Sequence, residues 1–193
     1  MNKIQINLYD ILTCISNAQD LVSPRLSTHN QQVAYLSYRL SEQIGLPIDE
    51  QRDIFFAGLI HDIGAMSSKE MLALIEAEPM SVNNHAFRGA KLFEEFKPLQ
   101  YVSRIIKFHH FPWAHGKNTN YKREEIPFAS HIVHLADRIC SLLDSNRNIL
   151  TQLPDILSRI REQSGSVFHP DLVDVLSKLI PKEYIWLDLT SKV

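Results

Sequence analysis

The sequence is poor in the residues that mark linkers, disulfide frameworks and membrane spans. Its 193 residues contain only six glycines, nine prolines and two cysteines. So little glycine and proline excludes a linker-rich or disordered chain. The two cysteines, Cys14 and Cys140, form no metal or redox motif, and such sparse use of cysteine fits a reducing cytoplasm. We therefore expect a folded domain that acts in the cytoplasm.

Long apolar runs and an excess of positive charge are also missing. No apolar run reaches the roughly 18 residues that a membrane-spanning helix needs, so we expect no membrane insertion. Residues 1–14 are interrupted by Asn, Gln and Asp and do not resemble a signal peptide. The formal net charge of −2 argues against duplex nucleic acid as a partner. A local basic pocket for a small phosphate ligand is compatible with this charge.

Helical periodicity dominates what is present, and no segment alternates in the way a β-strand would. Apolar residues recur at spacings of three and four, which is typical of amphipathic helices. The pattern predicts an all-α fold, a compact bundle of about eight or nine helices. The predicted helices are 7–22, 28–45, 49–64, 67–78, 83–96, 99–110, 128–144, 153–165 and 169–181.

Caps and turns set the expected boundaries. We expect Thr28 to begin one helix, Gly45 to end it and Asp49 to cap the next. Residues 111–127 form a long polar loop, and loops of this length are often functional. We assign residues 1–185 to one domain. Residues 186–193 are either a strand or helix docked on the core or the start of a linker to further domains.

Nine histidines are the compositional anomaly. In "FFAGLIHDIGAM", residues 55–66, His61 and Asp62 close a very apolar helix. Burying a carboxylate beside an imidazole costs several kcal/mol unless another charge compensates for it. Similar polar residues stand at other helix ends or on apolar faces, and imidazole with carboxylate suits Mn, Fe, Zn or Ni. The candidate metal ligands are His29, His61, Asp62, His85, His109, His110 and Asp137.

The order of these residues resembles the HD superfamily of metal-dependent phosphohydrolases, most closely its HD-GYP branch, which hydrolyses cyclic di-GMP. The resemblance covers about residues 10–176. It is carried by "AGLIHDIG" (57–64), "HAFRGAKLF" (85–93), "IPFASHIVHLADRICSLL" (126–143) and "GSVFHPDLVDVL" (165–176). In the last stretch, His169 stands where the family has an aspartate.

The resemblance implies two divalent transition-metal ions and catalytic roles for His61 and Asp62. Asp62 would bridge the two ions. His29 and Asp137 would complete one metal site, and His85, His109 and His110 the other. A hydroxide shared by the metals would attack the phosphorus. Three-metal members carry a Glu at the position of Arg25, so we expect two ions.

The departures from the family fall on the substrate side. Ala65 replaces the lysine of the family's HDxGK motif, and the GYP loop is missing from 111–127. Tyr121 is a stand-in for the family tyrosine, Trp113 keeps part of the loop shape, and Arg147 lies one place from the family arginine. These three are the candidate substrate-binding residues, although packing under the loop is an equal reading for Trp113.

Three functions fit this pattern. The first is a phosphodiesterase related to the HD-GYP enzymes, and the second is a degenerate signalling or binding module without turnover. The third is a phosphohydrolase of another nucleotide. The expected ligand is a small phosphate ester or a cyclic dinucleotide, and a homodimer or additional domains are open expectations. His131 and His134 share the helix of Asp137, and either a ligand role or a hydrogen-bonded role is open for them.

Overall fold

The computed structural model describes residues 7–21, 28–65, 70 and 83–191. The described part is mainly helical, which confirms the predicted all-α class. The predicted helix at 67–78 lies outside the described residues, apart from residue 70. Arg25, on which the expectation of two rather than three metals was based, also lies outside them. The described α-helices are α1 (Leu8–Asp20), α2 (His29–Ile44), α3 (Ile48–Ile60), α5 (Asn83–Phe93), α6 (Gln100–Lys107), α7 (Phe128–Leu142), α8 (Ile149–Glu162), α9 (Pro170–Leu179) and α10 (Glu183–Thr190).

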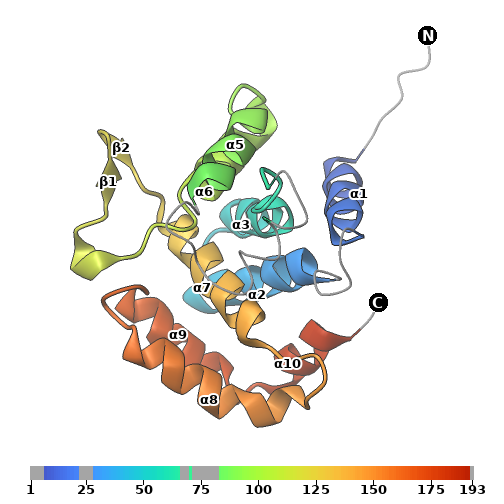
Figure 1. Cartoon of the computed structure of the whole chain (residues 1–193), viewed down its shortest axis with the longest axis vertical. Helices are drawn as coiled ribbons and strands as arrows, with labels where there is room; N and C mark the ends of the chain where they lie inside the picture. Colours follow the sequence, from blue (N-terminus) through green and yellow to red (C-terminus); the bar gives the residue numbers. More distant parts are fainter. Residues whose placement is uncertain (1–6, 22–27, 66–69, 71–82, 192–193) are drawn as a thin grey trace.

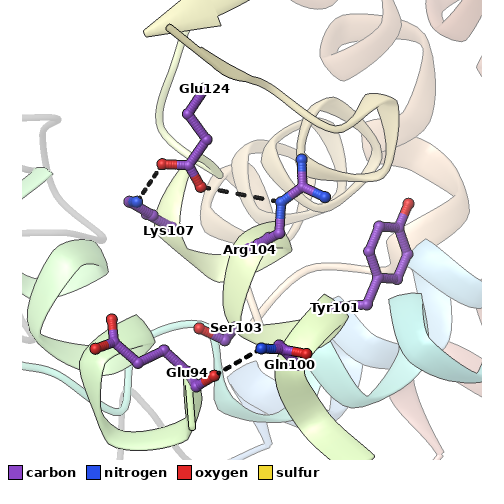
Figure 2. A pocket seen from close by; sticks show the side chains of 7 residues that line it. All are labelled: Glu94, Gln100, Tyr101, Ser103, Arg104, Lys107 and Glu124. Atoms are coloured by element: carbon purple, nitrogen blue, oxygen red, sulfur yellow. Dashed lines mark hydrogen bonds and ion pairs between the residues drawn. The ribbon is translucent and has the colours of Figure 1, made fainter. Parts of the chain in front are cut away.

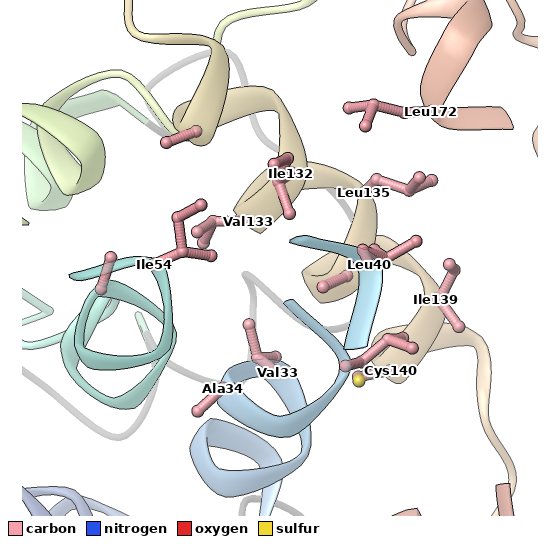
Figure 3. Packing of buried hydrophobic residues seen from close by; sticks show 14 of the residues in the cluster. Val33, Ala34, Leu40, Ile54, Ile132, Val133, Leu135, Ile139, Cys140 and Leu172 are labelled. Carbon is pink, nitrogen blue, oxygen red and sulfur yellow. The ribbon is translucent and has the colours of Figure 1, made fainter. Parts of the chain in front are cut away.

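Helices α2, α3 and α7 form the centre of the bundle (Figure 1). Their apolar faces meet around side chains such as Val33, Ile54 and Val133, all fully buried (Figure 3). Helices α5 and α6 pack on one flank, α1 lies against α3, and α8 and α9 cover another flank. The centre is therefore a rigid scaffold from which helix ends can present polar side chains.

The helix boundaries follow the expected caps only in part. Gly45, with φ of 82°, ends α2 as predicted. Thr28 precedes this helix, but its φ of 81° differs from the extended backbone of a usual N-cap. Asp49 does not cap α3, because the helix already begins at Ile48 after Pro47. Asp49 instead lies in the first turn, where a carboxylate interacts favourably with the helix dipole.

The C-terminal part of the chain is more regular than its sequence suggested. Helix α8 begins at Ile149, four residues before the predicted start, because Asn148 accepts a hydrogen bond from Leu150 N at 2.9 Å. The tail forms α10, which packs on α2 and α8. Trp186 of α10 is fully buried, and its Nε1 donates to Leu179 O at 3.2 Å. The boundary drawn at residue 185 therefore falls inside a docked helix.

The loop at 111–127 contains secondary structure that the sequence did not reveal. It holds two short elements, the 3₁₀ turn Ala114–Gly116 and a hairpin of β1 (Asn120–Tyr121) and β2 (Glu124–Glu125). Lys122 and Arg123 at the hairpin tip have φ of 48° and 72°, as a type I′ turn requires.

Ion pairs and backbone hydrogen bonds anchor this loop. Glu124 accepts from Lys107 and lies 3.9 Å from Arg104 Nε at a surface pocket of about 370 Å³ (Figure 2). The loop is also strapped to residues 165–167. The N–H groups of residues 113–115 donate to the carbonyls of Val167, Ser166 and Gly165 at 2.7–2.8 Å.

Candidate metal centre

Seven polar side chains converge at one end of the central helices, and we call them the His/Asp centre. Each is buried, and none is more than 6 % exposed. They come from the start of α2, the turn after α3, the first turns of α5, the turn after α6 and the middle of α7. The members are His29, His61, Asp62, His85, His109, His110 and Asp137. All the side chains predicted as metal ligands are therefore brought together.

One group within the centre consists of His29, His61 and Asp137. Each offers one ligand atom, and these atoms lie within 4.8 Å of one another. His29 Nε2 lies 3.2 Å from Asp137 Oδ1, and His61 Nε2 lies 3.9 Å from the same oxygen. Two imidazole nitrogens and one carboxylate oxygen thus face a common point.

A second group consists of Asp62, His85, His109 and His110, again with ligand atoms within 4.8 Å. Asp62 Oδ1 lies 3.0 Å from His85 Nε2 and 3.8 Å from His109 Nε2. His110 Nε2 is 3.1 Å from His85 Nε2. Three imidazoles and a carboxylate are a donor set that first-row transition metals accept.

Asp62 lies between the two groups. Its Oδ1 faces His85 and His109, while its Oδ2 lies 3.4 Å from His61 Nε2 in the other group. One carboxylate oxygen is therefore directed toward each group. This is the arrangement that a carboxylate bridging two cations needs.

Backbone carbonyls fix the orientation of two of the imidazoles. His61 Nδ1 donates to Gly58 O at 2.8 Å, and His109 Nδ1 donates to Ile106 O at 2.7 Å. A carbonyl only accepts, so these contacts place the proton on Nδ1 and leave the Nε2 lone pair directed into the centre. Partners of this kind are a regular feature of metal-ligating histidines.

The hydrogen-bonding state of the centre fits bound cations. Four buried atoms of the centre make no hydrogen bond of acceptable geometry with the described residues: His29 Nε2, His61 Nε2, Asp62 Oδ1 and His109 Nε2. Buried polar atoms are normally satisfied, and leaving one without a partner costs about 1–3 kcal/mol. A divalent ion in each group would satisfy all four, so the residues present fit a dinuclear site.

The charges in the centre perturb its titration. Burial raises the pKa of the Asp62 carboxyl, but His61 and His85 outweigh burial and hold the pKa well below its usual range. Asp137 behaves similarly, because Arg138, His29 and His61 overcome its burial and keep its pKa well below the usual range. Both carboxylates therefore stay ionised, as metal ligands must be.

The imidazole of His109 is held neutral. Burial and the neighbouring histidines, His110, His61 and His85, lower its pKa well below the usual value. A neutral ring keeps a lone pair for a metal. In the same metal-free centre, burial lowers the pKa of His61, but the opposite effect of Asp62 and Asp137 is larger. The net result is a pKa raised to about 9. A metal at His61 would displace that proton.

Close backbone contact explains why glycine follows the His-Asp pair. A Cβ on Gly64 would lie 2.0 Å from His85 O and 2.4 Å from Gly89 N. The turn after α3 can therefore touch α5 only without a side chain at residue 64. Arg88 Nε also donates to Gly64 O at 2.9 Å. These contacts bring Asp62 within reach of His85.

The candidate substrate-binding residues lie in other surroundings. The Trp113 ring packs against His169 at 4.1 Å and His131 at 5.5 Å between ring centroids. Tyr121 packs against Phe87, Phe108 and Phe111 at 5.0–6.3 Å. Arg147 is exposed in the turn after α7. The two aromatic rings thus support the loop beside the centre, and Ala65, in place of the family lysine, is buried.

Sequence reasoning missed two contacts to the centre. Arg138 Nη2 donates to Asp137 Oδ2 at 2.9 Å, and Gln19 Nε2 donates to the backbone oxygen of Asp62 at 3.2 Å. Both residues are polar members of amphipathic helices, so only their positions in space distinguish them. The ring of His134, on the helix of Asp137, lies 6.0 Å from that of His110.

The geometry is that of a helical domain with two adjacent His/Asp groups that could each hold a metal ion, and the sequence assigns the domain to a family. Residues 26–142, more than half of the chain, match the model of the HD domain, and the protein belongs to the HD domain family. In the part of the chain that the structure describes, no helix has the length and apolarity to cross a membrane.

Two relatives are phosphodiesterases of cyclic dinucleotides. The chain is 30 % identical over 191 residues to the 3'3'-cGAMP-specific phosphodiesterase 1 of Vibrio cholerae. The aligned region covers 95 % of this chain and 44 % of that protein. It is 27 % identical over 180 residues to the cyclic di-GMP phosphodiesterase of Thermotoga maritima, covering 88 % of this chain and 48 % of that protein. The chain thus spans about half the length of these relatives.

Solved structures share the fold. A cyclic GMP-AMP-specific phosphodiesterase of V. cholerae aligns with a TM-score of 0.73 at 18 % identity, over 96 % of this chain and 51 % of that one. The HD domain of the L. monocytogenes phosphodiesterase PgpH, in complex with cyclic di-AMP, aligns with a TM-score of 0.59 at 13 % identity, over 93 % and 99 %. At these identities the likeness establishes the fold alone.

Proposed function

We propose that this chain is a metal-dependent phosphodiesterase that hydrolyses a cyclic dinucleotide. The seven side chains of the His/Asp centre would hold two divalent transition-metal ions, Fe, Mn, Ni or Zn, with Asp62 shared between them. The observation that carries this proposal is the position of Asp62, which directs one oxygen toward each group of imidazoles. The activities of the relatives support the choice of a cyclic dinucleotide.

Two bound ions of this kind supply a water-derived nucleophile at neutral pH and stabilise the charge that develops on phosphate oxygens. The residues of the chain prepare the site for this chemistry. Asp62 sets the spacing of the two groups, and the Gly58 carbonyl keeps the His61 ring oriented. Burial of all seven side chains limits competing hydration. We therefore assign catalytic roles to His61 and Asp62.

We assign the substrate side to two aromatic residues of the loop at 111–127 and to Arg147 in the turn after α7. Arg147 is an exposed cation that we propose contacts a phosphate, while Tyr121 and Trp113 shape the loop through aromatic packing. An Arg147→Ala variant would then raise KM without changing thermal stability. Equal KM in the variant and the parent would exclude the assignment of Arg147.

A second candidate is a binding module that keeps the metals but lacks turnover. Ala65 favours it, since a buried methyl group replaces the lysine that the family resemblance assigns to the phosphate. A hairpin also stands where the GYP loop is expected. This candidate predicts tight binding of a cyclic dinucleotide and no product.

One experiment separates the two candidates. Chain purified without oxygen and loaded with Mn²⁺ or Fe²⁺ is incubated with cyclic GMP-AMP, cyclic di-GMP, cyclic di-AMP and mononucleotides, with Asp62→Ala as the control. Linear dinucleotide from the parent and none from the control supports the phosphodiesterase. Calorimetric binding without product supports the module. Cleavage of mononucleotides alone would assign a different substrate class, and neither binding nor cleavage would reject both candidates.

A further inference from the structure

Arg138 folds back onto its neighbour in the sequence. Adjacent residues of an α-helix point in directions about 100° apart and do not normally face each other. In α7, however, Arg138 Nη2 lies 2.9 Å and Nε lies 3.2 Å from Asp137 Oδ2. The Arg138 side chain is 15 % exposed and that of Asp137 is 3 % exposed. Such a conformation costs side-chain entropy, and the two contacts with Asp137 Oδ2 help to offset that cost.

The two oxygens of the Asp137 carboxylate have different partners. Two of the three guanidinium nitrogens, Nε and Nη2, are directed at Oδ2. The other oxygen, Oδ1, faces His29 Nε2 at 3.2 Å and His61 Nε2 at 3.9 Å. A carboxylate that accepts two hydrogen bonds from an arginine at one oxygen has its other oxygen better placed for a cation. The rotation of the carboxylate is thereby fixed before any ion binds.

Ser141 adds a weaker contact one helical turn further along α7. Its Oγ lies 3.3 Å from Asp137 Oδ1 and 3.4 Å from Arg138 Nη2. The guanidinium carries the charge and the two shorter contacts, so it dominates the orientation. Removing the Ser141 hydroxyl therefore tests the helix and its packing, while most of the constraint on Asp137 remains.

The second group of the centre is oriented by other means. His109 is held by the Ile106 carbonyl, and His85 lies on α5 close to the turn at Gly64. These supports of His109 and His85 lie on α5, α6 and the turn after α3, whereas α7 reaches this group through the ring of His134, 6.0 Å from that of His110. A change at Arg138 should therefore act on one metal position and spare the other.

We propose that Arg138 is a positioning residue for Asp137, and that it sets the affinity of the ion held by His29, His61 and Asp137. This inference rests on the proposed two-ion centre. Partners that orient a ligand in this way typically contribute 10–100-fold to metal affinity. The substitution Arg138→Lys retains the positive charge but not the paired N–H groups, so it should keep only part of the affinity.

The test is a titration of the metal-free chain of 193 residues with Mn²⁺, with the free ion followed by electron paramagnetic resonance. The variants are Arg138→Gln, Arg138→Lys and Ser141→Ala. His29→Ala and His85→Ala identify which binding step belongs to which group. Arg104→Gln is a matched control, because Arg104 pairs with Glu124 on the surface. Thermal unfolding of each metal-free variant is recorded beside the titration.

We expect two binding steps in the parent. Arg138→Gln should weaken by about 10–100-fold the step that His29→Ala abolishes, and leave the step that His85→Ala abolishes. Arg138→Lys should lie between parent and Arg138→Gln, while Ser141→Ala and Arg104→Gln should resemble the parent. Unchanged affinities, or equal weakening of both steps, would overturn the role of Arg138. Fewer than two steps in the parent would instead overturn the two-ion centre itself.

Discussion

His85 Nε2 lies 3.1 Å from His110 Nε2 inside the buried centre. Without a metal, one proton must sit between these two nitrogens, since two lone pairs at this distance repel. A cation that accepts both lone pairs would remove this repulsion without the proton. Asp62 completes the same group, yet its second oxygen faces His61.

We therefore expect unequal losses of metal from two variants. His85→Ala should lose one ion per chain, because it belongs to one group only. Asp62→Ala should lose both, because it lies between the groups. Metal content of protein purified without oxygen, measured by mass spectrometry, checks this, with the exposed His115→Ala as the control. Two ions retained by Asp62→Ala would contradict the bridging arrangement.

Replacement of Gly64 should disrupt the centre through the backbone. A Cβ there would meet His85 O at 2.0 Å, so Gly64→Ala must separate the turn after α3 from α5. We expect a loss of about 3 kcal/mol or more in the free energy of unfolding, measured in urea. Gly45→Ala is the control, because its Cβ would meet nothing within 4 Å and only its φ of 82° opposes it. That change should cost about 1 kcal/mol. Similar losses in both variants would contradict the close contact.

His131 should make the fold sensitive to acid. Burial and the charges of His134 and His169 lower its pKa to about 4, against a usual pKa of about 6.5. The folded chain thus keeps the ring neutral, while the unfolded chain takes up a proton near pH 6.5. The contribution of the neutral His131 ring to the free energy of unfolding is complete above pH 6.5 and is lost as the pH falls toward 4.

The loss attributable to His131 should reach at most about 3 kcal/mol between pH 6.5 and 4. His131→Gln cannot titrate in this range and should flatten the pH dependence. Urea unfolding across this range, in the presence of a chelator, measures the slope. His115→Gln, which changes an exposed histidine, should retain the parental slope. A parental slope in His131→Gln would assign the acid sensitivity to other groups.

His169 takes over the capping role of the aspartate that the family resemblance places there. Its Nδ1 accepts a hydrogen bond from Asp171 N at 3.2 Å, and its ring packs on Trp113 and Phe128. His169→Ala should cost about 1–2 kcal/mol of stability. His169→Asp should recover the cap but not the ring packing, and so fall between parent and alanine in urea unfolding. An aspartate variant as unstable as the alanine variant would argue against the cap.

The seven members of the centre could be recognised from the sequence because each breaks a local pattern. His61 and Asp62 close an otherwise apolar helix, and Asp137 stands among buried apolar residues of α7. Periodicity also located most helices. Their ends were less accurate. Asp49 was expected as a cap, but Pro47 fixes a start two residues earlier.

Features that depend on the third dimension could not be read from the sequence. Adjacent helical residues are expected to diverge, so the contact of Arg138 with Asp137 had no local pattern. The hairpin tip uses Lys122 and Arg123 at positive φ, where Asn and Gly would have indicated the turn. α10 was ambiguous because its eight residues include both buried Trp186 and exposed Leu187.

The strap between residues 113–115 and 165–167 closes a circuit in the chain. One side of the circuit follows directly after the His109–His110 turn, and the other side leads into α9. The segment between the two sides of the strap contains α7 and α8. If residues 165–167 open locally, the hydrogen bonds that hold residues 113–115 break, and these residues follow closely after His109 and His110. We therefore expect the amides of residues 113–115 and the start of α9 to become exposed together in hydrogen exchange, although about 50 residues separate the two sides of the strap along the backbone.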